Sequence, residues 1–152
     1  MKIRTGRLVA AAVLVACSFS GAAVAQNRLN HLRSWAGRYP THRTGRLTRN
    51  FFQLPEIRQP LLKLLSRVDF NLLTRAYQVE TPVKRLGDYL AVKVCRPHLC
   101  DTDNAGFAIN LRDGSIYVRM SGTNEPRWFN SGGQYTALPQ RVLDFLNEFS
   151  AT

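Results

Sequence analysis

Residues that carry enzyme chemistry are scarce in this 152-residue sequence, which has only three cysteines and three histidines. The histidines, His31, His42 and His98, lie far apart, and the HExxH, GxSxG and phosphate-loop motifs are absent. The acidic run DTDN at 101–104 lacks the glycine and the glutamate of an EF-hand loop. We therefore predict a protein that is not an enzyme and that needs no cofactor.

Long apolar runs are missing after the first 25 residues. The chain opens with basic residues, continues with an apolar run from Leu8 to Ala16, and reaches a small-residue cleavage pattern at Ala25. This layout predicts a secretory signal peptide over 1–25, since no segment reaches the roughly 18 apolar residues of a membrane span. The stretch before Cys17 also resembles a lipobox, so a lipoprotein anchored at Cys17 is the alternative. We expect a periplasmic or secreted protein.

Only two cysteines, Cys95 and Cys100, remain once the signal peptide is removed. In an oxidising compartment an even pair favours a disulfide. One histidine lies between them, and two cysteines with one histidine are too few ligands for a closed zinc site. The spacing of four residues also differs from the CxxC motif of redox proteins. We predict a Cys95–Cys100 disulfide and no metal site.

Acidic residues are also missing between the predicted cleavage site and Phe51, whereas arginines are frequent there. The whole chain has a formal charge of +11, and removal of the three basic residues of the signal peptide leaves +8. We predict a basic, partly irregular arm over 26–50, which either binds an anionic envelope polymer or lipid or is a solvated lead-in. Its arginines are Arg28, Arg33, Arg38, Arg43, Arg46 and Arg49.

Hydrophobic periodicity predicts helices at both ends of a single domain over 51–152. A short helix is also expected around Trp35, before irregular chain up to Asn50. An apolar stripe that we interpret as core indicates one kinked helix or two helices, with Asp69 as the expected cap of a helix over 70–77. An amphipathic helix begins near Pro139. The stripe consists of Leu61, Leu65, Val68 and Leu72.

Alternating apolar residues between Pro82 and the last helix predict antiparallel strands. Residues 89–94 alternate as a half-buried strand, and a further short strand is expected near 127–129. The fold class is therefore α+β, an antiparallel sheet of about four or five strands with N-terminal helices and a C-terminal helix packed against it. A two-residue turn at Asp113-Gly114 sets the expected cross-strand pairs, which are Leu111 with Ile116, Ile109 with Val118 and Phe107 with Met120.

The loop over 95–100, with the sequence CRPHLC, connects two of these strands. The disulfide and Pro97 restrict the loop before it meets a partner, which favours insertion of its tip into a cleft. The alternative interpretation is that the disulfide only stabilises the strand connection and that the loop binds nothing.

This loop resembles the Cys-Lys-Pro-His-Asp-Cys loop of the Ivy family, the periplasmic inhibitors of vertebrate lysozyme. The resemblance covers residues 87–120 and includes the flanking strands. It implies that the loop enters the cleft of a lysozyme, where His98 meets the two catalytic carboxylates with the assistance of Arg96. Arg96 keeps the positive charge of the family lysine, whereas Leu99 replaces an acidic residue.

We predict an exported proteinaceous inhibitor of lysozyme-type muramidases, whose inhibitory loop consists of Cys95, Arg96, Pro97, His98, Leu99 and Cys100. Because a charge of +8 slows encounter with a basic lysozyme, endogenous lytic transglycosylases are an alternative target. A non-enzymatic envelope protein that binds through the Arg-rich arm is a further alternative. Association of two copies into a homodimer is a further alternative.

Overall fold

The computed structural model describes residues 29–44, 47–122 and 124–148, so the predicted signal peptide and Cys17 lie outside the described residues. Within them, no helix has both the length and the apolar character needed to cross a membrane. In chain order the elements are η1 (Asn30–Trp35), β1 (Thr41–Thr44), β2 (Leu47–Asn50), η2 (Phe51–Gln53), α2 (Pro55–Leu64), α3 (Arg67–Asn71), η3 (Leu72–Ala76), β3 (Val79–Glu80), β4 (Lys84–Leu86), β5 (Tyr89–Cys95), β6 (Asn104–Asn110), β7 (Ile116–Ser121), β8 (Arg127–Asn130), η4 (Tyr135–Ala137) and α4 (Gln140–Asn147).

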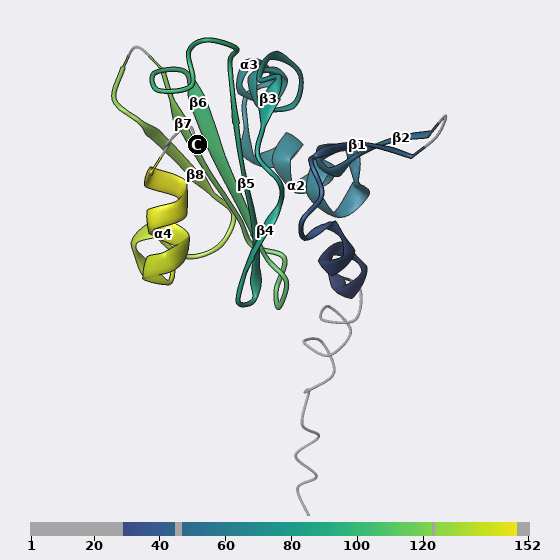
Figure 1. The fold of residues 1–152 in the computed structure, drawn as a ribbon. Coiled ribbons are helices and arrows are strands. Elements are labelled where there is room, and N and C mark those ends of the chain that lie inside the picture. The colour runs from purple at the N-terminus through teal and green to yellow at the C-terminus, as the bar shows by residue number, and fades with distance from the viewer. Residues whose placement is uncertain (1–28, 45–46, 123, 149–152) are drawn as a thin grey trace, which may run out of the picture.

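The main sheet confirms the predicted α+β class (Figure 1). Among the described residues it has six strands in the order β3-β5-β6-β7-β8, with β4 also paired to β5, and every pairing is antiparallel. The prediction of about four or five strands missed β3 and β4, which are two and three residues long. Strands this short show too little alternation to be detected in a sequence.

Among the described residues, two hydrophobic cores lie on opposite faces of the sheet. The larger core joins the sheet to the N-terminal helices and centres on Phe51, Phe52 and Phe107, whose rings pack edge to face. The smaller core lies under α4, which buries Val142 and Leu146 against the sheet. Strand β5 was predicted as half-buried, but α4 covers its second face, so the strand is buried on both faces.

The helical region after Pro55 forms two helices separated by Leu65 and Ser66. The prediction that Asp69 caps the second helix is wrong, because the Ser66 hydroxyl caps α3 by accepting a hydrogen bond from the Asp69 backbone N–H at 3.1 Å. The Asp69 side chain instead pairs with Arg127 of β8. The apolar stripe is only partly core, since Val68 is 69% exposed.

The hairpin of β6 and β7 forms with a different register from the predicted one. Ile109 pairs with Ile116 and Phe107 with Val118, which is a shift of two residues. The turn is wider than expected because side chains hold it: Asn110 accepts a hydrogen bond from the Arg112 N–H and Asp113 from the Ser115 N–H. A shift of two residues keeps the predicted apolar residues on one face.

The segment before Phe51 is more ordered than the predicted irregular arm. Leu32 and Trp35 of η1 are buried in the larger core, and β1 pairs with β2 in a two-stranded ribbon that projects from the body in Figure 1. Thr41 donates both its backbone N–H and its hydroxyl to Glu80 of β3. The prediction of irregular chain is therefore wrong for 41–44 and 47–50, whereas the domain boundary at residue 51 stays a prediction.

The contact between α4 and β6 depends on the absence of a side chain at Gly106. A Cβ atom at this position would lie 2.8 Å from Leu146 Cδ2 and 3.3 Å from the Leu146 backbone. We expect Gly106→Ala to lower the free energy of unfolding by about 1–2 kcal/mol because α4 must shift outward. Gly122→Ala is the control, because its Cβ meets nothing within 4 Å. Denaturant titration of both variants checks this, and equal effects would contradict it.

The ion pair of Asp69 and Arg127 should make stability depend on pH. The hydrogen bond from Arg127 outweighs burial and lowers the pKa of Asp69 below its ordinary 3.8. Because the folded-state pKa is the lower one, the stabilisation is present above pH 3.8 and is lost as pH falls through the folded value. We expect Asp69→Asn to cost about 1 kcal/mol at neutral pH, since the Arg127 side chain is half exposed and solvent screens the pair.

Urea unfolding of wild type and Asp69→Asn at neutral and acidic pH measures this difference, which should shrink in acid. Asp88→Asn is the matched control, because Asp88 pairs with Arg112 at 3.7 Å between two exposed side chains. A difference for Asp69→Asn that is independent of pH would contradict the assignment.

Candidate functional site

The predicted loop connects β5 and β6 at one end of the sheet. Cys95 is the last residue of β5 and pairs with Asn104, the first residue of β6. A disulfide joins Cys95 to Cys100, with their Cα atoms 4.9 Å apart. Only Cys95 lies at the neck of the connection, so the disulfide ties one side of the loop back to β5 and does not span the neck.

Backbone hydrogen bonds also hold the loop in one conformation. The N–H groups of Thr102 and Asp103 both donate to the carbonyl of Leu99, at 3.0 and 2.7 Å. The Leu99 N–H donates to the Arg96 carbonyl, and the Asn104 side-chain amide donates to the carbonyl of Cys100. The loop is therefore a hydrogen-bonded structure with a covalent closure.

His98 lies at the exposed tip of the loop. Its backbone φ of 65° is the only positive φ of a non-glycine residue in the described part of the chain. Such a conformation is uncommon for a residue with a side chain, and it clusters at functional sites. Among the described residues no hydrogen-bond or ion-pair partner reaches the imidazole, and the neighbouring Leu99 is 46% exposed.

Arg96 is the predicted cation of the loop, but its side chain turns back toward the protein. The Arg96 Nε atom lies 2.5 Å from Asp103 Oδ2, and the Arg96 backbone N–H donates to the Asp103 carbonyl at 3.0 Å. The other carboxylate oxygen of Asp103 accepts a hydrogen bond from the Tyr77 hydroxyl at 2.6 Å. Burial, with the nearby Asp103 carboxylate, raises the pKa of Tyr77, so the phenol stays a donor.

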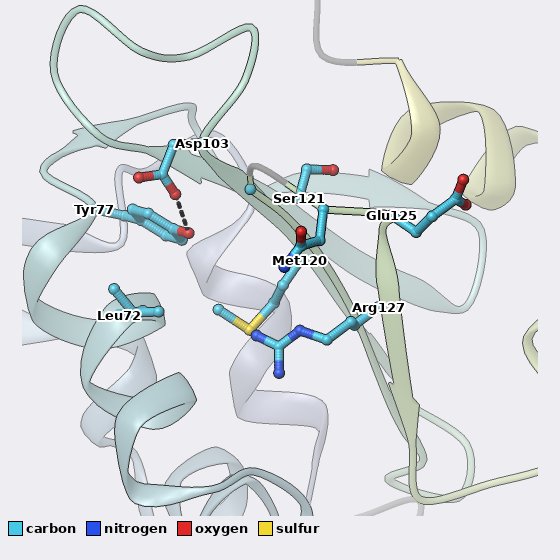
Figure 2. A pocket seen from close by; sticks show the side chains of 9 residues that line it. Leu72, Tyr77, Asp103, Met120, Ser121, Glu125 and Arg127 are labelled. Carbon is cyan, nitrogen blue, oxygen red and sulfur yellow. Dashed lines mark hydrogen bonds between the residues drawn. The ribbon is translucent and has the colours of Figure 1, made fainter.

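A cavity of about 350 Å³ opens beside this network, lined by Leu72, Tyr77 and Asp103 on one side and by residues of β7, β8 and their connection on the other. Figure 2 shows Tyr77 and Asp103 on one side of it and Ser121, Glu125 and Arg127 on the other. Buried oxygen atoms without a hydrogen-bond partner among the described residues lie on the neighbouring strand ends, at Asn104 Oδ1 and Ser121 Oγ. No metal-binding group of histidine, cysteine and carboxylate side chains occurs in the part of the chain that the structure describes.

Sequence reasoning missed Tyr77 and Asp103 as parts of the site. Asp103 belongs to the DTDN run, which was considered only as an EF-hand loop and set aside, and Tyr77 was assigned to the end of a helix. Their contact spans 26 residues of sequence, and no local pattern indicates such a pair. The predicted antiparallel pairing of the two strands indicates only that Asp103 lies near Cys95, and it gives no sign of Tyr77.

The arginines of the predicted arm do not form a described cluster. Arg33 is half-buried, with its Nε atom unpartnered among the described residues, whereas Arg38 and Arg49 are exposed. The side chains of Arg28, Arg43 and Arg46 lie outside the described residues. Binding of an anionic polymer or lipid by this arm stays a prediction, as does a homodimer.

Comparison with known proteins identifies the family. The family model described as "Inhibitor of vertebrate lysozyme (Ivy)" matches residues 56–152. None of the curated proteins or solved structures compared with the chain gives a significant match. The matched segment is more than half of the chain and contains the main sheet, the loop and α4, but not the arginine-rich segment. The chain therefore belongs to the Ivy family of lysozyme inhibitors.

Proposed function

We propose that this protein is an exported inhibitor of lysozyme-type muramidases, which inserts the loop 95–100 into the catalytic cleft with His98 leading. The observation that carries the proposal is the exposed His98 imidazole, held at a positive φ on a loop closed by a disulfide. A loop that is ordered before binding loses little conformational entropy on insertion. The family membership supports the class of target.

The chemistry of the target suits an imidazole. Glycosidases of this kind hold one protonated and one ionised carboxyl group on either side of the scissile bond. The two ring nitrogens of His98 face opposite directions, so one ring can hydrogen-bond with both carboxyl groups. An imidazole placed there occupies the position of the substrate and blocks cleavage.

Lytic transglycosylases are the second candidate target. They cleave the same glycan with an acidic catalytic residue, which His98 can engage in the same way. The observation that favours them is the formal charge of +8 on the predicted mature chain, which slows encounter with a basic lysozyme.

The first test replaces His98. We expect His98→Asn to weaken inhibition of a sensitive muramidase by roughly 30-fold or more, because the imidazole is the central contact of the proposed interface. Asparagine tolerates a positive φ better than most residues, so the loop conformation should survive. Lysis of peptidoglycan by a vertebrate lysozyme and by a lytic transglycosylase, with increasing inhibitor, measures the effect.

His31→Asn is the matched control for this variant. His31 is also an exposed histidine, but it lies in η1, where it faces Glu56 at 3.7 Å. The control should inhibit like wild type. Equal inhibition by wild type and His98→Asn would rule out the proposed insertion, and inhibition of the transglycosylase alone would select the second target.

The second test opens the loop. We expect the double variant Cys95→Ser with Cys100→Ser to lose about 2 kcal/mol of unfolding free energy, since the disulfide closes a short ring. Inhibition should weaken by roughly tenfold or more, because a mobile loop must be ordered on binding. Chemical denaturation and the lysis assay measure the two quantities.

Reductant supplies the control for the disulfide. The predicted mature chain contains only these two cysteines, so reductant should bring wild type to the level of the double variant and leave the variant unchanged. A double variant that inhibits as well as oxidised wild type would contradict a role for loop closure.

A further inference from the structure

Asp103 lies at the junction of the loop with the body of the protein. Both of its side-chain oxygens are engaged, Oδ2 by the Arg96 Nε atom at 2.5 Å and Oδ1 by the Tyr77 hydroxyl at 2.6 Å. Its backbone carbonyl also accepts the Arg96 N–H at 3.0 Å. A carboxylate that is bound on both oxygens from two directions has little freedom to rotate.

Tyr77 connects this junction to the hydrophobic core. The residue follows η3, and it is 4% exposed among the residues of the larger core. Figure 2 shows its ring reaching from the helical side to the Asp103 carboxylate, with the dashed line marking their hydrogen bond. The network therefore fastens the loop to the packed helices, in addition to its attachment to β5 and β6.

His98 lies close in sequence to this fastening. No hydrogen bond or ion pair joins its side chain to the rest of the described chain, and only Pro97 separates it from Arg96. The disulfide anchors the other side of the loop at Cys100. Arg96 and Cys100 are thus attachments on either side of the tip, in addition to the hydrogen bonds that the Leu99 carbonyl accepts.

We infer that Asp103, held by Tyr77, is a positioning residue that fixes the pose of the inhibitory loop through Arg96. This inference rests on the proposed function for its effect on inhibition. It gives Arg96 a role within the protein, because its Nε atom is engaged by Asp103 while the side chain stays about half exposed. Arg96 supports the loop, and His98 makes the contact.

The test compares two aspartate-to-asparagine substitutions in the connection between β5 and β6. Asp103→Asn keeps the shape of the side chain and an acceptor for Tyr77, but it removes the charge that holds Arg96. Asp101→Asn makes the same change in charge at an exposed residue whose side chain has no partner among the described residues. Tyr77→Phe removes the other hydrogen bond and leaves the ring in the core.

Amide hydrogen exchange in the free protein reports the pose directly. The N–H groups of Leu99 and Asp103 bond within the loop, and those of Val118 and Phe107 lie in the sheet. We expect Asp103→Asn and Tyr77→Phe to speed exchange in the loop by roughly tenfold and to leave the sheet unchanged. Asp101→Asn should leave both unchanged.

Inhibition of a vertebrate lysozyme is measured in parallel. We expect roughly a fivefold loss of affinity for Asp103→Asn, because the pair is partly exposed and its coupling is moderate. The inference is overturned if the loop amides of Asp103→Asn exchange as slowly as those of wild type. It is also overturned if Asp103→Asn and Asp101→Asn inhibit the lysozyme with equal affinity. If wild type inhibits neither enzyme class, the proposed function fails, and loop exchange alone then decides whether Asp103 fixes the pose.

Discussion

The pairing of β5 with β6 is the constraint on which the rest of the structure depends. Seven residue pairs join these central strands, from Tyr89 with Asn110 to Cys95 with Asn104. Both faces of the pair are buried, one under the N-terminal helices and the other under α4. Because the loop is the connection at the end of this ladder, its base inherits the rigidity of the most buried part of the protein.

Local sequence patterns predicted the elements whose periodicity is strong. Alternation located β5, β6 and β7, helical spacing located α4, and a short strand was expected where β8 lies. The errors came from interactions that a periodic pattern does not contain. The register of the hairpin slipped by two residues because Asn110 and Asp113 bond to the turn backbone. The cap lies at Ser66 because α3 begins at Arg67, which places Asp69 inside the helix, where its side chain pairs with an arginine 58 residues away.

The residues of the candidate site also fall into those that local sequence patterns predicted and those that only the tertiary structure brings together. The cysteines and His98 stand together in sequence, so the compartment argument and the family resemblance were enough to single them out. The disulfide and the family are confirmed, whereas the role of His98 stays a proposal. Tyr77 and Asp103 meet only after the helices pack on the sheet, so their part in the site required the tertiary structure.

Ion pairing at the loop changes how the net charge bears on the choice of target. The predicted mature chain carries +8, but the segments 96–103 and 124–127 hold two arginines and three acids. Asp103 engages Arg96 and Asp69 engages Arg127, whereas Asp101 and Glu125 have no ion-pair partner among the described residues. Charges farther from the contact than about 10 Å are largely screened at physiological salt. At the proposed contact the charges of these two segments therefore nearly balance, so the overall charge of +8 does not by itself exclude a basic lysozyme.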